Sequence, residues 1–447
     1  MTEGNDHLNK KSLRLVTEPG ALPLVERVAG RSGSTLGALA IAKRSGAVPL
    51  TRPQEPTPGP RFDGSTPADE LESRLSLASD SVRAVLEKSL EERVLDRDDL
   101  LLLMNVRGHD FDALVATADW WRRKTVGNVV TYVVNRNINF TNVCTIGCGF
   151  CAFSTGLAME DAYFLSFDQV VEKAKECWER GGTEVCIQGG IHPTMDWTYY
   201  PGLLKAIKKE LPLIHTHAFS PMEIIWGSKS AGIPVDEYLV LLKEAGLDTI
   251  PGTAAEILDD SVRQILSPKK ESVAEWVEVV TTAHSLGIRS TATIMFGHVE
   301  TVEHRVEHLL LIRQIQKETG GFTEFVPLPF IHEFSPMYLQ GKCGPGPTRL
   351  DSVRLHAVVR LALRGYINNI QASWVKLGVD GVQECLQAGC NDFGGTLMEE
   401  SISRLAGARN GQELWVDEIA AAIRAIGRIP KQRSTTYGDP PRDPLPV

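Results

Sequence analysis

The chain has 447 residues and a formal net charge of −9, from 47 Lys and Arg against 56 Asp and Glu. Hydrophobic residues make up 43% and charged residues 23%, a composition that suits one to three packed domains. The acidic balance argues against nucleic-acid binding, and no apolar run approaches the roughly 20 residues that span a membrane. The first residues lack a signal peptide's apolar segment, so we expect a cytoplasmic protein.

Changes in composition divide the chain into four parts. Residues 1–66 are expected to be a flexible, disordered arm, because they lead into the Pro- and Gly-rich stretch 51–67. Residues 67–127 have helical periodicity and predict a small helical cap. Residues 128–430 form the main domain, and residues 431–447 are assigned to a C-terminal tail.

The main domain alternates short apolar runs with amphipathic segments. The expected strands are 129–141, 183–190, 213–220, 249–255, 289–297, 323–330, 368–375 and 392–397. Strand and helix repeated about eight times predict an α/β protein with a (β/α)8 TIM-type barrel. A doubly wound open sheet is the alternative. In a barrel, the chemistry belongs at the carboxyl ends of the strands.

Three cysteines follow the first expected strand in the sequence NFTNVCTIGCGFCAFS. Cys144, Cys148 and Cys151 have the spacing C-x3-C-x2-C. Three thiolates on one short loop suit three irons of a 4Fe-4S cluster, which leaves the fourth iron open to a ligand such as S-adenosylmethionine (SAM). A structural zinc site usually has four Cys or His ligands in paired spacings, and a purely structural role for the three cysteines is the remaining alternative.

The other five cysteines are expected to lie outside this site. Cys177 and Cys186 fall in an expected helix and strand and are interpreted as small buried side chains. Cys343, Cys385 and Cys390 are scattered and are expected to be structural or free.

The triplet, with Phe150 before its last cysteine, resembles the signature of the radical SAM superfamily. Six further blocks resemble the CofH-type subunit of FO synthase: TEVCIQGGIHP, HTHAFSPMEI, PGTAAEILDDSVR, STATIMFGHVET, GGFTEFVPLPFIH and NDFGGTLMEESISRLAG. The resemblance covers about residues 110–430. It implies a radical SAM barrel with a 4Fe-4S cluster and SAM as cofactors.

The resemblance also implies a reaction and its partners. In that family, the 4-hydroxybenzyl fragment of L-tyrosine is transferred to 5-amino-6-(D-ribitylamino)uracil during synthesis of FO and coenzyme F420. The implied partners are a CofG-type subunit and an electron donor such as ferredoxin or flavodoxin, with no nucleic acid and no membrane. The chain departs from the family at Thr145, Ile146, Gly149 and Phe393, and its single cysteine triplet predicts one subunit rather than the fused enzyme.

Seven residues are expected to bind the cofactor. Gln188, Gly189 and Gly190 end the second expected strand, where glycines allow close approach of the backbone to SAM. Glu256 and Lys270, or its neighbour Lys269, offer charges for the polar groups of SAM. The resemblance adds two residues from its adenine-contacting segment, Met295 and Gly297.

Polar residues near strand ends are the candidates for substrate binding. They are His217, Ser220, His298, Glu324, His332, Gln371 and Asn391. Such side chains inside a barrel need hydrogen-bond partners, which a diaminouracil or an amino acid can supply. Three other functions stay open: a radical SAM enzyme of the futalosine route to menaquinone, a non-catalytic iron–sulfur protein, and a zinc-stabilised binding module.

Overall fold

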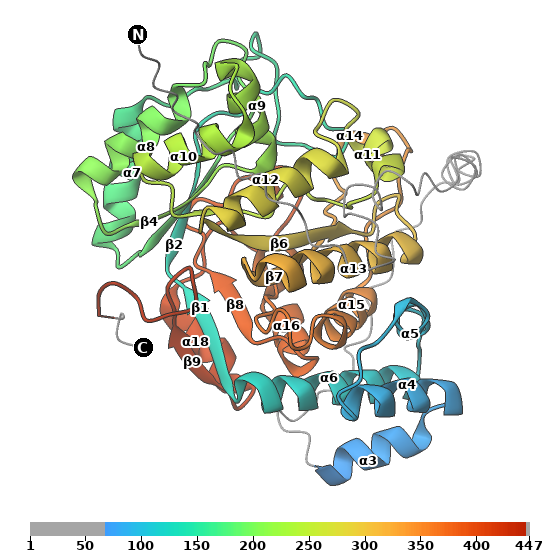
Figure 1. Ribbon diagram of the computed structural model, residues 1–447. Helices are drawn as coiled ribbons and strands as arrows, with labels where there is room; N and C mark the ends of the chain where they lie inside the picture. Colours follow the sequence, from blue (N-terminus) through green and yellow to red (C-terminus); the bar gives the residue numbers. More distant parts are fainter. Residues whose placement is uncertain (1–67, 444–447) are drawn as a thin grey trace, which may run out of the picture.

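Four helices begin the described part of the chain, residues 68–443 of the computed structural model (Figure 1). They are α3 (Ala68–Leu77), α4 (Asp80–Leu90), α5 (Arg97–Leu103) and α6 (His109–Val126). Asp96 begins α5, because its side chain accepts from the backbone N–H groups of Asp98 and Asp99. Helix α6 packs against α3, α4 and α15 (Arg349–Ala362), which joins this cap to the main domain. The arm expected at 1–66 lies outside the described residues.

A curled sheet of six parallel strands forms the centre of the main domain (Figure 1). In chain order, the strands are β2 (Asn135–Asn139), β3 (Glu184–Gln188), β4 (His215–Ala218), β5 (Thr249–Ile250), β6 (Arg289–Phe296) and β7 (Phe322–Pro329). Isolated parallel bridges continue the ring through Phe325 and Ile370, Gln371 and Asp392, and Met398 and Arg136. The order never reverses, as it would in a doubly wound sheet. The predicted TIM-type fold is therefore confirmed, as a partial barrel.

The first expected strand, 129–141, is divided at Val134 between two sheets. Strand β1 (Val129–Val133) leaves the barrel sheet and pairs in parallel with β8 (Asp392–Gly395) and β9 (Ile429–Gln432). Strand β9 was not expected, and it overlaps the segment assigned to a tail from the sequence. Lys431 and Gln432 of that segment thus belong to a sheet, and Arg433 just beyond the strand is buried.

Most of the remaining helices cover the outside of the barrel sheet, whereas the last one packs against β9 (Figure 1). Several begin at a Ser or Thr whose side chain accepts the N–H of the third helical residue, as Ser166, Ser220, Ser272 and Thr348 do. No helix within residues 68–443 has both the length and the apolarity to cross a membrane. The helices are α7 (Phe167–Glu179), α8 (Tyr199–Glu210), α9 (Pro221–Ala231), α10 (Val235–Ala245), α11 (Asp260–Leu266), α12 (Val273–Ser285), α13 (Val302–Thr319), α14 (Pro336–Leu339), α16 (Trp374–Gln387), α17 (Ile402–Leu405) and α18 (Val416–Ala425).

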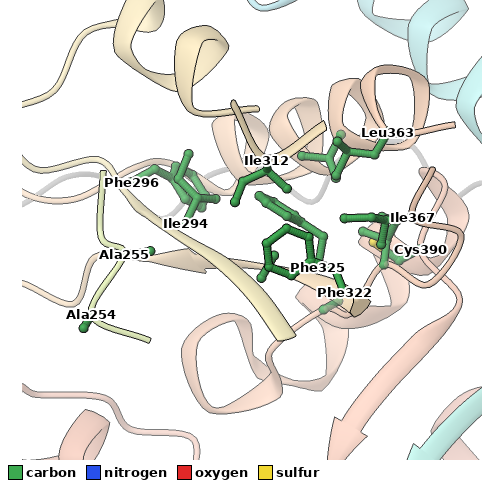
Figure 2. Packing of buried hydrophobic residues seen from close by; sticks show 14 of the residues in the cluster. Ala254, Ala255, Ile294, Phe296, Ile312, Phe322, Phe325, Leu363, Ile367 and Cys390 are labelled. Atoms are coloured by element: carbon green, nitrogen blue, oxygen red, sulfur yellow. The ribbon is translucent and has the colours of Figure 1, made fainter. Parts of the chain in front are cut away.

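Apolar side chains fill the layer between the strands and these helices (Figure 2). Ile294 and Phe296 of β6 and Phe325 of β7 point outward and lie near Ile312 of α13. Cys390 belongs to the same hydrophobic cluster and is fully buried. Because side chains alternate along a strand, this apolar outer face leaves the intervening residues of each strand to line the inside of the barrel.

Candidate active site

The cysteine loop follows β2 and is held from two sides by backbone hydrogen bonds. The N–H of Thr145 donates to the carbonyl of Ile191 at 3.0 Å, and the N–H of Ile191 points at Cys144 Sγ at 3.4 Å. On the other side, the N–H of Gly149 donates to the carbonyl of Leu266, the last residue of α11, at 2.7 Å. The loop is therefore fixed at the carboxyl end of the barrel, between the loop after β3 and α11.

The chemistry of the three thiols fits a 4Fe-4S cluster. Cys144, Cys148 and Cys151 are free and partly accessible, so their sulfurs are open to ligation. A cluster takes one thiolate per iron, so the three sulfurs need not meet at one point. Within residues 68–443, no three Cys, His, Asp or Glu side chains converge on a single-ion site. Burial raises the pKa of the Cys148 thiol to about 12, so its ligation to iron must displace a proton.

Gly189 and Gly190 end β3 in direct contact with the start of the cysteine loop. A Cβ on Gly190 would lie 2.2 Å from the Val143 carbonyl oxygen and 2.8 Å from Cys144 Cβ. The buried carboxylate of Glu223 fixes this turn, because its Oε1 accepts a hydrogen bond from the N–H of Gly189 at 3.1 Å. Burial raises the pKa of Glu223 to about 7. Glu223 was not among the residues predicted from the sequence, although its spacing from Ser220 is that of a capping box.

We expect Gly190→Ala to lower the iron content of the reconstituted protein, because the new methyl group would displace the backbone beside Cys144. Iron and sulfide measured per chain after anaerobic reconstitution test this prediction. Gly344→Ala is the matched control, since a Cβ at Gly344 meets no atom within 4 Å. Full iron content in the Gly190 variant would contradict a close contact between the turn and the cluster loop.

A buried ion pair lies beside the cysteine loop. Lys270 Nζ is 2.7 Å from Glu256 Oε1, and both side chains are at most 10% exposed. Burial alone would lower the pKa of Lys270, but the charges of Glu256, Glu271 and Cys148 raise it overall. Glu256 Oε2 is buried without a hydrogen-bond partner and lies 3.6 Å from Arg263 Nη1, so this oxygen can still accept a hydrogen bond from a ligand. Lys269, the neighbouring candidate, is exposed.

Backbone strain supports a functional role for the loop that carries Glu256. Glu256 has φ +36° and Ala254 has φ +66°, conformations that side-chain-bearing residues rarely adopt. The expected strand 249–255 is consequently only two residues long, because the chain turns away after Ile250. Strained positions of this kind cluster at ligand-binding sites, where the surrounding structure maintains them.

Met295 and Gly297 end β6 with different roles in the fold. Met295 alternates with the outward-facing Ile294 and Phe296 and so faces the inside, and its N–H donates to the Glu256 carbonyl at 2.9 Å. Gly297 has φ +93°, and a Cβ there would lie 2.3 Å from Pro347 Cδ. The tight turn explains Gly297, whereas Met295 remains suited to an apolar contact with a ligand.

Three of the substrate candidates face the barrel interior or its upper rim. His217 lies on β4, and its Nδ1 contacts Thr249 Oγ1 at 2.7 Å. Gln371 lies 2.9 Å from the position that a Cβ on Gly394 would take, beside the inner end of β8. His332 follows β7 and packs its ring against Tyr338, with 24% of its side chain exposed. These three retain polar atoms for a substrate.

The placement of Ser220 and Asn391 does not fit the expected contact with substrate. The Ser220 hydroxyl donates to Glu223 Oε2 at 2.7 Å as part of the cap of α9. Asn391 precedes β8, so it lies at the amino end of that strand. Its Oδ1 accepts from Arg360 Nη2 at 2.8 Å and from the N–H of Ile370 at 2.9 Å. Both side chains are therefore committed to the protein.

His298 is also committed to the protein. Its Nε2 donates to the Met295 carbonyl at 2.9 Å, and its Nδ1 lies 3.0 Å from Glu300 Oε2. Neither side chain is exposed to solvent. Burial would raise the pKa of Glu300, but His298 and Arg305 lower it to about 2. The His298 ring therefore shapes the turn after β6 and has both of its nitrogens engaged there.

Glu324 lies near the amino end of β7, away from the cysteine loop. Its Oε2 is 3.2 Å from Arg433 Nη2 and accepts the hydroxyl of Tyr437. Arg433 also forms two hydrogen bonds to Asp392, at 2.5 and 3.0 Å. This buried group closes the amino end of the barrel, so Glu324 belongs to its floor and not to the predicted substrate contacts.

A curled parallel barrel with a three-cysteine loop after its first strand defines a radical SAM protein. The Radical SAM superfamily profile matches residues 138–312, and the profile for the CofH/MqnC C-terminal region matches residues 319–443. Two solved structures share the fold. Methylornithine synthase has a TM-score of 0.62 at 20% identity, covering 78% of this chain and 97% of that one. The FeFe-hydrogenase maturase HydG from Carboxydothermus hydrogenoformans has a TM-score of 0.63 at 14% identity, covering 83% of each chain.

Sequence relatives define the family more closely. A 5-amino-6-(D-ribitylamino)uracil–L-tyrosine 4-hydroxyphenyl transferase from Methanothermobacter thermautotrophicus is 49% identical over 79% of this chain and 96% of the relative. The FO synthase of Nocardia farcinica is 51% identical over 83% of this chain, but the match spans only 43% of that relative. The chain belongs to the CofH-type family of FO synthase proteins, and it spans less than half the length of the FO synthases that it matches.

Proposed function

We propose that the protein is a transferase that joins the 4-hydroxybenzyl fragment of L-tyrosine to 5-amino-6-(D-ribitylamino)uracil, a step toward FO. The observation that carries this proposal is the match to the Methanothermobacter transferase, at 49% identity along 96% of its length. The position of the cysteine loop at the carboxyl end of the barrel supports it, because barrel enzymes carry their active sites there.

Radical SAM proteins use a 4Fe-4S cluster and SAM, and the residues of this site fit both. Cys144, Cys148 and Cys151 are the proposed cluster ligands. When bound, the cluster and SAM supply the electron and the carbon radical that remove a hydrogen atom from the substrate. The proposed SAM contacts are Gln188, Gly189, Gly190, Glu256, Lys270 and Met295.

The protein's own contribution is to orient these groups and to exclude water. Glu223 fixes the turn at Gly189, and Lys270 positions Glu256 so that Oε2 stays available as an acceptor for an amino group or a ribose hydroxyl. The floor formed around Arg433 closes the far end, so substrates enter only from the side of the cysteine loop. His217, His332 and Gln371 are the proposed substrate contacts.

Two partners and a cellular location complete the proposal. The long FO synthases that contain this chain as 39–43% of their length support a functional partner of the CofG type, which would act on the product. A small electron carrier such as ferredoxin or flavodoxin would reduce the cluster. A cytoplasmic location is proposed with them, since a cluster with an open iron requires a reducing compartment.

An anaerobic assay tests the function directly. The reconstituted and reduced protein is given SAM, L-tyrosine and the diaminouracil, and mass spectrometry follows 5′-deoxyadenosine and the hydroxybenzyl–uracil adduct. Formation of both products is expected. Deoxyadenosine without the adduct would overturn the substrate assignment and favour the futalosine alternative, because the matched C-terminal profile is shared by CofH and MqnC proteins. A stable cluster with neither product would favour the electron-carrier alternative.

A further inference from the structure

Three asparagines line the inside of β2 at successive depths of the barrel. Asn135, Asn137 and Asn139 alternate with Arg136, which reaches helix α7, and with Ile138, which lies in the outer hydrophobic cluster. The strand register pairs the three asparagines in turn with Glu184, Cys186 and Gln188 of β3. The inner wall therefore carries polar rows at three levels.

The lowest row is satisfied within the protein. Asn135 Nδ2 donates to Glu184 Oε1 at 2.7 Å, and Asn135 Oδ1 accepts from the N–H of Leu397 at 2.9 Å. His215, which pairs with Glu184 in the register, contacts Thr249 Oγ1 through Nε2 at 2.8 Å, while Thr249 itself pairs with His217 of the middle row. The lowest row lies next to the ion pairs around Arg433, and the Asn135 amide has a partner at both its nitrogen and its oxygen.

The uppermost row is also satisfied. Asn139 Nδ2 donates to the carbonyl of Gln188 at 3.1 Å, and Asn139 Oδ1 accepts from Ser401 Oγ at 3.0 Å. Gln188 Oε1 accepts from Thr253 Oγ1 at 3.3 Å. The asparagines above and below Asn137 thus both have partners for their amide groups.

The middle row differs from both of its neighbours. Asn137 Oδ1 is buried without a hydrogen-bond partner, and its amide meets none within residues 68–443. Cys186 and His217 follow it in the register of β3 and β4, and His217 Nε2 has no hydrogen-bond partner in the described chain. Cys186 Sγ accepts from Gln188 Nε2 at 3.7 Å, so the unpaired polar groups of this row are the Asn137 amide and His217 Nε2. Polar groups inside folded proteins are nearly always paired, so these two groups beneath the cofactor residues indicate a ligand.

We propose that the row Asn137–Cys186–His217 binds the pyrimidine ring of the diaminouracil, with the Asn137 amide and His217 Nε2 pairing with its polar edge. This proposal rests on the proposed function and deepens it. Neighbouring strands lie about 4.8 Å apart, so the backbones of Asn137 and His217 are separated by roughly 10 Å, a span that a substituted six-membered ring lying over Cys186 can bridge with a hydrogen bond at each end. Cys186 lies between them in the register, and its small side chain allows the ring to pack against it.

The charge of the row selects the diaminouracil over tyrosine. Burial lowers the pKa of His217 to about 4, so its imidazole is neutral at pH 7. Amide, thiol and neutral imidazole suit an uncharged ring that carries N–H donors and carbonyl acceptors. Tyrosine brings an ammonium and a carboxylate, whose burial requires opposite charges that this row lacks. The charged Glu184 and Arg433 below are already hydrogen-bonded to Asn135 and Asp392.

Asn137→Leu tests the row, with Asn135→Leu as its matched control two residues away on the same face. In the Asn137 variant, the dissociation constant and KM for the diaminouracil should rise about tenfold, with the KM for tyrosine unchanged. Its melting temperature should not fall, because the lost amide has no partner in the free protein. Asn135→Leu should lower the melting temperature, because it removes the amide group that donates to the buried Glu184 at 2.7 Å. Equilibrium dialysis of the holoenzyme with the diaminouracil gives the affinity independently of turnover.

The other possible outcomes of this experiment also decide whether the row binds the diaminouracil. If Asn137→Leu bound the diaminouracil as tightly as the wild type, or raised the KM for tyrosine instead, the proposal that this row binds the diaminouracil would be refuted. A melting temperature lowered as far as in Asn135→Leu would assign Asn137 a structural role and also overturn it. A wild-type protein that binds the diaminouracil more tightly than the Asn137 variant but forms no adduct would support the row and overturn the proposed reaction.

Discussion

Cys148→Ala is expected to abolish deoxyadenosine and adduct formation while leaving the barrel folded. Cys148 is the middle residue of the triplet, and its loop is held by backbone hydrogen bonds of Gly149 and Thr145 that do not involve its side chain. Loss of groups that merely support a metal ligand lowers metal affinity or activity 10–100-fold, so loss of a ligand should lower turnover by more than about 100-fold. Iron content, circular dichroism and deoxyadenosine formation measure the three parts of this prediction.

Cys343→Ala provides the control for that experiment. Cys343 is also a free and partly accessible thiol, but it lies outside the triplet. The control should keep its iron and its activity, which would show that thiol loss alone is harmless. Deoxyadenosine formation at the wild-type rate by the Cys148 variant would refute the assignment of the cluster ligands. An unfolded Cys148 variant would be recognised by circular dichroism, and Cys148→Ser would then replace it.

The barrel and its cysteine loop were predictable because their signals are local. Strand and helix alternate visibly along the main domain, and the triplet directly follows a strand. The closing elements carried weaker signals. Strand β9 has the sequence IPKQ, which includes a proline and two polar residues and is mostly exposed, so its pattern is not that of a strand. Its place is set by pairing with β1, about 300 residues earlier in the chain.

The site residues also differ in whether their role depends on a local signal in the sequence or on partners that are distant in the chain. Gly189, Gly190 and Lys270 could be selected from the sequence, because turn glycines and charges near strand ends are visible without a structure. The side chains of Ser220, His298 and Asn391 are occupied by interactions within the protein. Their partners are Glu223, Glu300 and Arg360, and only the folded chain shows that these lie close enough. Asn137 was missed for a related reason, since alternation predicts that it faces inward but not that its amide lacks a partner.

The floor of the barrel shows how a segment assigned to a tail becomes essential to the fold. Arg433 is 4% exposed, and the two carboxylates that it contacts, Asp392 and Glu324, are 0% and 8% exposed. Two parallel hydrogen bonds to Asp392 form the fork geometry that makes arginine–carboxylate pairs strong. Burial raises the pKa of Glu324 to about 7 even though Arg433 opposes the shift. These carboxylates therefore depend on a single guanidinium.

Arg433→Met is expected to lower the free energy of unfolding by about 3–5 kcal/mol, because it leaves buried carboxylates without their counter-charge. Urea unfolding at pH 8 measures the loss. Lys431→Met, two residues earlier in β9, is the matched control: its ion pair with Asp439 is exposed, and its removal should change stability by less than about 1 kcal/mol. Equal effects of the two substitutions would contradict a stabilising role for the floor.

The same variant should also change how stability depends on pH. Without Arg433, the pKa of Glu324 in the folded state rises further above its unfolded value, so at pH values between these two pKa values the folded variant binds more protons than the unfolded chain. Its free energy of unfolding must then increase as the pH falls from 8 to 5, and its deficit relative to wild type must shrink. A deficit that is the same at pH 5 and pH 8 would mean that the destabilisation arises from lost packing, and the floor would then act through the shape of Arg433 and not through its charge.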